Sequence, residues 1–269
     1  MPELDAINLT EAREDLVLLR EAAREAGLIA MRYFGNNPQV WMKGCTSPVS
    51  EADHAADAYL RETLLKARPD YGWLSEETAD DHARLSARRT FVVDPIDGTR
   101  GFLDGLHSWC VSVAVVESGR SLAGVLECPA KRETYWALPG EGAYLNDKPI
   151  HVRPLGEAVD IGGPKPLVDL VPEPWQGRLR RTAYIPSLAY RLAMIAAGKL
   201  DATFVKPSAH DWDIAAADLI LNEAGGALLD RTGKRPRYAG AVINHGALAA
   251  GSGELLGVLT GVLSGLDEG

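Results

Sequence analysis

The sequence FVVDPIDGTRGF at residues 91–102 constrains the fold and function of this chain more than any other stretch. Three apolar residues typical of a buried strand lead directly into two acids, Asp94 and Asp97. Because proline disfavours helical backbone in the residue before it, Asp94 should end the strand and Asp97 should lie past the bend. The two carboxylates, with the carbonyl of Ile96 between them, offer hard oxygen ligands for a divalent metal. Gly98 permits close backbone approach by an anion.

Two further acidic motifs favour this metal site over the simple Asx turn that Asp-Pro and Asp-Gly commonly form. Glu76 and Glu77 end a short strand that begins at Trp73. Because successive strand residues point to opposite faces, one acid would bind metal while the other reaches a water. Asp213 lies in the first turn of a predicted helix and could share the metal. The simpler alternatives are solvated acids for the glutamates and a helix cap for Asp213.

Composition limits the class of protein and its partners. The 269 residues, 46% hydrophobic and 24% charged, are enough for a large core. A net charge of −9 disfavours binding to a nucleic-acid polymer, but it allows a small phosphorylated substrate whose charge a metal offsets. We see no signal peptide and no apolar run long enough for a membrane span. Cys45, Cys110 and Cys128 have no ligand spacing and indicate reduced thiols, so we expect a cytoplasmic protein.

Periodicity predicts two halves within one compact catalytic unit. Amphipathic helices are expected over residues 8–34 and 50–67, the second capped by Ser50 and Asp53, before an antiparallel meander at 109–145. The stretch between Asp80 and Arg89 is expected to be exposed. The Pro- and Gly-rich residues 149–174 separate an N-terminal α+β half (1–150), which holds the antiparallel sheet and the metal-binding motifs, from a C-terminal α/β half (151–269). In that second half we predict strands at 182–185, 201–205, 226–229 and 241–244, and helices at 187–197, at 211–224 and from 252 onward.

Four motifs, in this order, resemble the inositol monophosphatase superfamily of lithium-sensitive, magnesium-dependent phosphatases. They are Lys43 with Ser47-Pro-Val-Ser-Glu-Ala-Asp53, Leu74-Ser-Glu76-Glu77, Asp94-Pro-Ile-Asp97-Gly98-Thr99, and Trp212-Asp213 followed by Glu223-Ala-Gly-Gly226. The resemblance covers roughly residues 10–260. It implies an α/β fold, a layered αβαβα sandwich shared with the fructose-1,6-bisphosphatases.

The same resemblance implies roles for individual residues. Glu77 and Thr99 would orient the attacking water, and the phosphate would rest on the amides of Gly98 and Thr99. Two or three Mg²⁺ ions would offset the substrate charge, lower the pKa of a bound water and stabilise the leaving oxygen, and Li⁺ would inhibit. The implied metal ligands are Glu76, Asp94, the carbonyl of Ile96, Asp97 and Asp213. The expected substrate-binding residues are Asp97, Gly98, Thr99, Ser187 and Lys206. A ligand set without His or Cys disfavours zinc.

One departure from the family concerns the loop before the second helix. Family members usually have an aspartate at about the positions of Cys45, Thr46 and Ser47, where it partners the threonine and supports water activation. Only neutral residues stand there in this chain. The number of metal ions therefore stays open, and Ser47 is the candidate catalytic substitute. We interpret Asp53 as an acid favoured by the helix dipole rather than as a catalytic residue.

Two clues favour a nucleotide substrate. The loop at 47–53 resembles that of the 3'(2'),5'-bisphosphate nucleotidases, and Lys206 stands where inositol-specific members usually have a glutamate that binds sugar hydroxyls. An ammonium attracts anions but accepts no hydroxyl proton, so Lys206 would approach a second phosphate. The alternative for Lys206 is a solvated lysine at a strand end. Tyr190 and Arg191 are also open to two interpretations, contact with base or phosphate and a simple helix face.

These observations predict a phosphoric monoester hydrolase that removes the 3'(2')-phosphate of adenosine 3'(2'),5'-bisphosphate by attack of metal-activated water. One alternative is an inositol-1-monophosphatase. Another, from a different class, is a regulatory member of the superfamily that binds a transcription complex. The expected partner is a small phosphorylated metabolite, with no nucleic-acid polymer and no membrane, and the resemblance leaves a homodimer or a monomer open.

Overall fold

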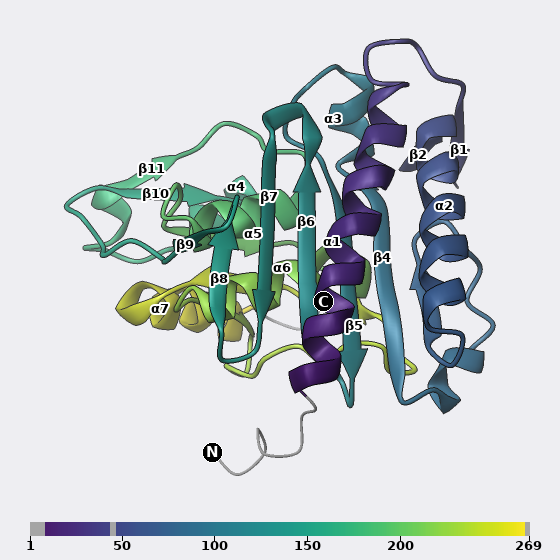
Figure 1. The fold of residues 1–269 in the computed structure, drawn as a ribbon. Coiled ribbons are helices and arrows are strands. Elements are labelled where there is room, and N and C mark those ends of the chain that lie inside the picture. The colour runs from purple at the N-terminus through teal and green to yellow at the C-terminus, as the bar shows by residue number, and fades with distance from the viewer. Residues whose placement is uncertain (1–8, 44–46, 267–269) are drawn as a thin grey trace.

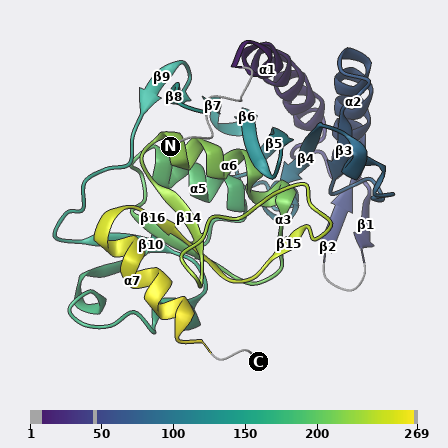
Figure 2. The same cartoon turned by 90° about the horizontal axis from the view of Figure 1, so that it is seen from below.

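Alternating layers of helix and sheet make up residues 9–43 and 47–266, the part of the chain that the computed structural model describes (Figure 1). Two helices cover the outer face of a seven-stranded sheet, two lie between this sheet and a five-stranded sheet, and one covers the far face of the smaller sheet (Figure 2). The αβαβα sandwich is thus confirmed. In this order the helices are α1 (Leu9–Met31), α2 (Glu51–Ala67), α5 (Leu188–Ala196), α6 (Asp211–Glu223) and α7 (Gly253–Ser264).

The seven-stranded sheet contains the predicted meander. Its strand order follows the sequence from β3 to β9, with β3 and β4 parallel and the other neighbours antiparallel. Helices cover both faces of β4, which is buried throughout, and this explains its continuous apolar run. Cys110 and Cys128 are buried free thiols, whereas Cys45 lies outside the described residues. The strands are β3 (Gly72–Ser75), β4 (Arg89–Asp97), β5 (Cys110–Glu117), β6 (Arg120–Cys128), β7 (Glu133–Leu138), β8 (Gly142–Leu145) and β9 (Lys148–Ile150).

The five-stranded sheet corrects two predictions. Its order is β11-β10-β12-β16-β14, and β11, β10 and β12 are parallel. The strand predicted at 182–185 is wrong, because β11 ends at Arg181 and the chain then runs as a loop into α5. The strand predicted at 241–244 is also wrong, because the buried strand is the following segment, Leu-Ala-Ala-Gly, whose alanines have low strand propensity. The strands are β10 (Val159–Gly162), β11 (Leu179–Arg181), β12 (Ala202–Val205), β14 (Ala227–Asp230) and β16 (Leu248–Gly251).

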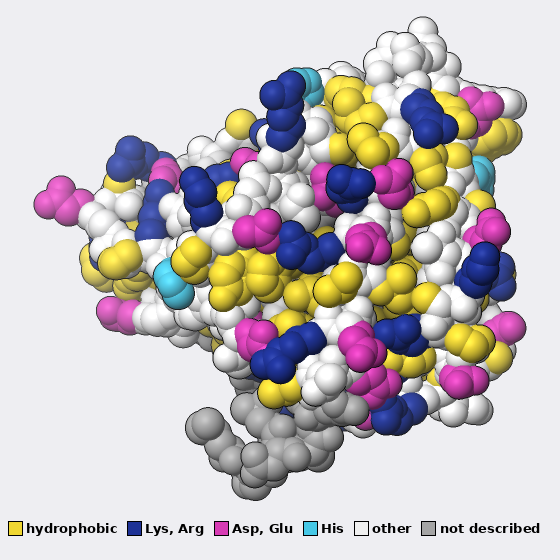
Figure 3. All heavy atoms as spheres, viewed as in Figure 1, with side chains coloured by type: hydrophobic (Ala, Val, Ile, Leu, Met, Phe, Trp, Pro, Cys, Tyr) yellow, Lys and Arg dark blue, Asp and Glu magenta, His cyan; other side chains and the backbone are white. Residues whose placement is uncertain are grey.

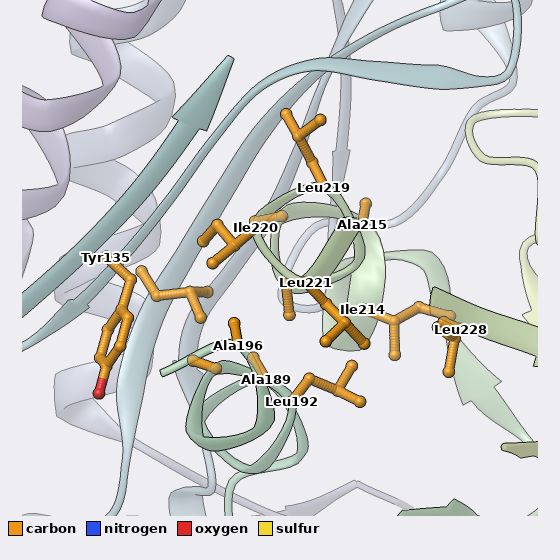
Figure 4. Packing of buried hydrophobic residues seen from close by; sticks show 14 of the residues in the cluster. Tyr135, Ala189, Leu192, Ala196, Ile214, Ala215, Leu219, Ile220, Leu221 and Leu228 are labelled. Carbon is orange, nitrogen blue, oxygen red and sulfur yellow. The ribbon is translucent and has the colours of Figure 1, made fainter. Parts of the chain in front are cut away.

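Helix α6 joins the two sheets and brings the C-terminal half of the chain against β4 to β8. Its small side chains allow close packing, since a Cβ at Gly124 of β6 would lie 2.9 Å from the carbonyl oxygen of Ala216. On the other side Ile214 and Leu221 of α6 face Leu192 of α5 in the buried core (Figure 4). This packing fixes the N-terminus of α6 beside the end of β4.

We predicted that the stretch from Asp80 to Arg89 is exposed, and this is wrong for two of its arginines. The side chain of Arg84 is 1% exposed and pairs with Asp80, and the side chain of Arg89 is fully buried against Asp15. A guanidinium is tolerated inside a protein when its forked donors are satisfied. The remaining elements are the hairpin β1 (Val40–Lys43) and β2 (Ser47–Ser50), the short helices α3 (Thr99–Leu103) and α4 (Lys165–Val168), and the paired strands β13 (Ala209–His210) and β15 (Asn244–His245).

Charges of both signs are intermingled with hydrophobic side chains on the face that α1 covers (Figure 3). Arg20 of α1 lies 2.7 Å from Asp147, which stands between β8 and β9, and Arg13 lies 2.6 Å from Glu141. Such exposed pairs contribute little stability. Within the described ranges, no helix combines the length and the apolar character that crossing a membrane requires.

Candidate metal centre and its supporting residues

Three carboxylates from two distant parts of the chain converge at the end of β4. One oxygen each of Asp94, Asp97 and Asp213 lies within 4.8 Å of the others, and we call these residues the acid cluster. The β4–β5 register shifts between Asp94 and Asp97, at Pro95, which has no N–H for the ladder. This break lets both acids turn toward the first turn of α6, where Asp213 lies.

Burial and mutual repulsion raise the pKa values in the acid cluster. Burial raises the pKa of Asp94 well above its ordinary value, and the charges of Glu76, Asp97 and Asp213 raise it further. Burial also raises the pKa of Asp213, with Asp97 as the next cause. Such a group of buried acids is unfavourable when ionised unless a cation compensates it. An oxygen-only donor set of this kind fits a hard divalent ion such as Mg²⁺.

Glu76 and Glu77 flank the acid cluster and share Lys43. The Nζ of Lys43 lies 2.5 Å from Oε1 of Glu77 and 3.6 Å from Oε1 of Glu76. Burial nevertheless raises the pKa of Glu77 to about 7. Its Oε2 is buried without a hydrogen-bond partner among the described residues. Glu77 therefore has one carboxylate oxygen available to accept a proton from a water.

Thr99 has an acidic partner that the sequence interpretation missed. Its hydroxyl donates to Oδ1 of Asp53 at 2.9 Å and lies 3.0 Å from the carbonyl oxygen of Ile96. The Oδ2 of Asp53 accepts from the amide and the hydroxyl of Ser50, at 2.8 and 2.6 Å. The capping pair is confirmed, and Asp53 makes an additional contact with Thr99 that its interpretation as a helix-terminal acid did not include.

Although positions 45–47 carry no acid, Thr99 still has a carboxylate partner. Asp53 occupies that place, and it comes from the first turn of α2 rather than from the loop. The side chain of Ser47, our candidate substitute, lies outside the described residues. An aspartate at the third helical position satisfies the cap and can also extend toward a neighbouring strand end, and capping alone does not reveal the second contact.

Ser187, which we predicted to bind substrate, has a hydroxyl that contacts Asp97 of the acid cluster. Oδ2 of Asp97 accepts from the Ser187 hydroxyl at 2.5 Å and from the amide of Ala189 at 2.6 Å. Burial raises the pKa of Asp97 to about 6 even though these hydrogen bonds oppose the shift. Gly98 has a φ of 97°, and a Cβ there would lie 3.1 Å from the backbone nitrogen of Ser187. Glycine is therefore required where the α5 N-terminus approaches this turn.

Lys206 lies directly after β12 and is exposed. It forms no ion pair with a carboxylate in the part of the chain that the structure describes. Seven residues later the chain reaches Asp213 by way of β13. An exposed ammonium in this position agrees with either sequence interpretation, a solvated lysine or a contact for an anionic substrate group.

Asp57 holds the segment that carries the two glutamates, and sequence reasoning missed it. Its carboxylate accepts from the hydroxyl of Ser75 and, at 2.9 Å, from the hydroxyl of Thr78. The Ser75 hydroxyl in turn accepts from the amide of Glu77 at 3.2 Å. The available signal is the four-residue spacing between Asp53 and Asp57, which places both acids on one face of α2.

Replacing Asp57 with asparagine is expected to lower kcat/KM for phosphate release about tenfold and to raise the Mg²⁺ concentration needed for half-maximal activity. The reason is that an amide keeps the shape of the group but cannot accept both hydroxyl protons equally well. A Mg²⁺ titration of the release rate measures both effects. Glu62→Gln, at an exposed site on the same helix, is the matched control. Equal behaviour of the two variants would mean that Asp57 positions nothing.

Comparison with known proteins gives consistent results. The model of the inositol monophosphatase family matches residues 11–264. The inositol-1-monophosphatase of Rhizobium meliloti (strain 1021) is 37% identical over 243 residues, which cover 85% of this chain and 90% of that protein. A histidinol-phosphatase of Chlorobaculum parvum is 33% identical and covers 82% of this chain, with 87% of its own length matched. The solved structure of the extragenic suppressor protein suhB from Bartonella henselae matches with a TM-score of 0.79 at 30% identity, over 94% of this chain and 99% of that one.

Proposed function

The chain belongs to the inositol monophosphatase family, and on this basis we propose that it hydrolyses phosphate monoesters with bound Mg²⁺. The observation that carries the proposal is the convergence of Asp94, Asp97 and Asp213 from β4 and α6. The residues that would hold the metal are Glu76, Asp94, the carbonyl of Ile96, Asp97 and Asp213. When bound, Mg²⁺ would supply positive charge against the phosphate and would make a coordinated water more acidic.

The protein groups around the acid cluster can orient a water for attack. The Thr99 hydroxyl donates its proton to Asp53, so its oxygen is left to accept a hydrogen bond from the water. The Oε2 of Glu77, which accepts no hydrogen bond among the described residues, offers a second acceptor, and a pKa of about 7 suits it to hold the proton that the water loses. Two acceptors fix the water with a lone pair directed at phosphorus. The phosphate would rest on the amides of Gly98 and Thr99.

The preferred substrate in this proposal is adenosine 3'(2'),5'-bisphosphate. What supports it is the exposed ammonium of Lys206, because a cation favours a second phosphate over neutral sugar hydroxyls. Inositol 1-phosphate is the second candidate, favoured by the name of the relative that is 37% identical. Histidinol phosphate, suggested by the name of another relative, carries a cationic amine that Lys206 would repel.

Phosphate release from adenosine 3',5'-bisphosphate and inositol 1-phosphate, measured side by side, tests the preference. We expect Lys206→Glu to raise the KM for the bisphosphate by roughly tenfold or more, because an attractive charge becomes repulsive. The KM for inositol 1-phosphate should stay level or fall. Lys148→Glu in β9, at the far edge of the seven-stranded sheet, is the control for net charge. A Lys206→Glu variant that keeps full bisphosphate affinity would rule out this role for Lys206.

A further inference from the structure

Arg191 of α5 is a partly exposed arginine with one buried side-chain nitrogen. Its Nε is buried without a hydrogen bond, and no carboxylate lies within ion-pair distance of it among the described residues. Arg84 and Arg89, which are more deeply buried, pair with Asp80 and Asp15. A buried guanidinium nitrogen without a partner is costly, which makes Arg191 a candidate to bind a group that the chain itself does not supply.

Arg191 lies in the N-terminal part of α5, the helix whose cap, Ser187, contacts the acid cluster. Arg191 lies four residues after Ser187, so the two share a helix face, and the Ser187 hydroxyl contacts Asp97. The positive charge of Arg191 is one of the influences that lower the pKa of Asp97. Its Cδ would lie 3.1 Å from a Cβ at Gly162. The absence of a side chain at Gly162 therefore makes room for the arginine stem.

The surroundings of Arg191 are those of a ligand site in a parallel sheet. Strands β11, β10 and β12 are parallel, so their carboxyl ends meet at one edge of the sheet. Gly162 ends β10 at this edge, Lys206 directly follows β12, and Ser187, which follows the loop after β11, caps α5. Ligands of such sheets bind outside the carboxyl ends of the strands.

We propose that Arg191 binds a second anionic group of the substrate, a phosphate or a carboxylate, while the acid cluster holds the phosphate that is cleaved. This rests on the proposed function and narrows the substrate class to metabolites that carry a second anionic group besides the phosphate that is cleaved. A guanidinium is always charged and presents planar donors that fit both oxygens of such a group. Lys206 adds a point charge at the same edge.

The competing explanation is that Arg191 only offsets the negative charge of the acid cluster. The two explanations differ in which substrates they affect. An offsetting charge acts on Mg²⁺ binding and on every substrate alike. A residue that binds a second anionic group affects the KM of substrates that have such a group and leaves the KM of substrates with a single phosphate unchanged.

The test compares Arg191→Gln and Arg191→Lys with wild type in the presence of Mg²⁺. The substrates with two phosphates are adenosine 3',5'-bisphosphate and fructose 1,6-bisphosphate, and those with one phosphate are inositol 1-phosphate and p-nitrophenyl phosphate. We expect Arg191→Gln to raise KM roughly 10- to 100-fold for the first pair only, with Arg191→Lys in between. Lys148→Gln, at a distant exposed site, is the control for lost charge. A uniform change across all four substrates, or none, would overturn the proposal.

Two further measurements separate this proposal from the proposed function. If wild type prefers inositol 1-phosphate, the nucleotidase assignment fails, yet a selective loss on fructose 1,6-bisphosphate in Arg191→Gln still supports the anion site. If wild type hydrolyses none of the four, titration calorimetry with adenosine 3',5'-bisphosphate decides, and equal affinity of wild type and variant refutes the site. If Arg191→Gln unfolds below assay temperature, Arg191→Lys replaces it. The quantity is then the ratio of KM for the bisphosphates to KM for the substrates with one phosphate, and a ratio equal to that of wild type contradicts the proposal.

Discussion

Replacing Asp213 with asparagine is expected to lower kcat/KM for phosphate release roughly 1,000-fold or more and to raise the melting temperature of the metal-free protein. Under the proposed function, activity falls because one of the three converging carboxylates is no longer available to a metal ion. The melting temperature rises because the buried acids repel one another when no cation is bound, and repulsion from Asp97 contributes to the raised pKa of Asp213. Phosphate release with Mg²⁺ and thermal unfolding in EDTA measure the two effects.

The opposite directions of these two effects distinguish a metal ligand from a structural residue. A carboxylate needed only for folding would lower the melting temperature along with the activity when it is replaced. Asp70→Asn, at an exposed site after α2, removes the same charge away from the cluster and should leave both quantities near wild type. An Asp213→Asn variant within tenfold of wild-type activity would contradict the assignment.

The second large effect is expected at the contact between Asp53 and Thr99. Thr99→Val should lower kcat about 100-fold, because a hydroxyl that orients the water is removed. Asp53→Asn should cause a loss of similar size. The amide can donate a hydrogen bond from its NH₂ group to the Thr99 oxygen, which reverses the direction of the hydrogen bond between the two residues. The double variant should be little worse than either single one, as expected for two residues that act through one hydrogen bond. Steady-state kinetics of the three variants measure this coupling.

The variant Ser50→Ala separates the two roles of Asp53, its contact with Thr99 and its part in the helix cap. The Ser50 hydroxyl contacts Oδ2 of Asp53 and leaves the oxygen that faces Thr99 untouched. Its removal should cost about 1 kcal/mol of folding stability while kcat stays within a few-fold of wild type. If Ser50→Ala lost as much activity as Thr99→Val, the account of Asp53 as the threonine partner would be wrong.

The features that were predictable from sequence are those encoded over a few residues. The apolar run before Asp94 predicts a buried strand, and Pro95 predicts the break that turns two acids toward one point. The order of the layers was implied by the family resemblance, and the predicted order of helices, meander and βα units agrees with it. Local patterns were sufficient here because the apolar run of the strand and the bend at the proline are both encoded in the residues that form them.

The features that sequence reasoning missed depend on contacts between distant segments. Asp53 accepts a hydrogen bond from the hydroxyl of Thr99, 46 residues away, and Asp57 accepts one from the hydroxyl of Ser75, 18 residues away. Arg89 is buried because α1 supplies Asp15, which the local charged stretch does not indicate. The position of β16 depends on pairing with β12 and β14, since its alanines carry little strand signal of their own.

The most direct test of the metal centre is the Mg²⁺ dependence of phosphate release from inositol 1-phosphate and from adenosine 3',5'-bisphosphate after EDTA treatment. The arrangement of Asp94, Asp97 and Asp213 predicts no detectable release without metal and recovery on addition of Mg²⁺. Recovery should be absent in Asp213→Asn at the same Mg²⁺ concentration. An EDTA-treated protein that still releases phosphate at the untreated rate would contradict a metal-dependent phosphatase built on these acids.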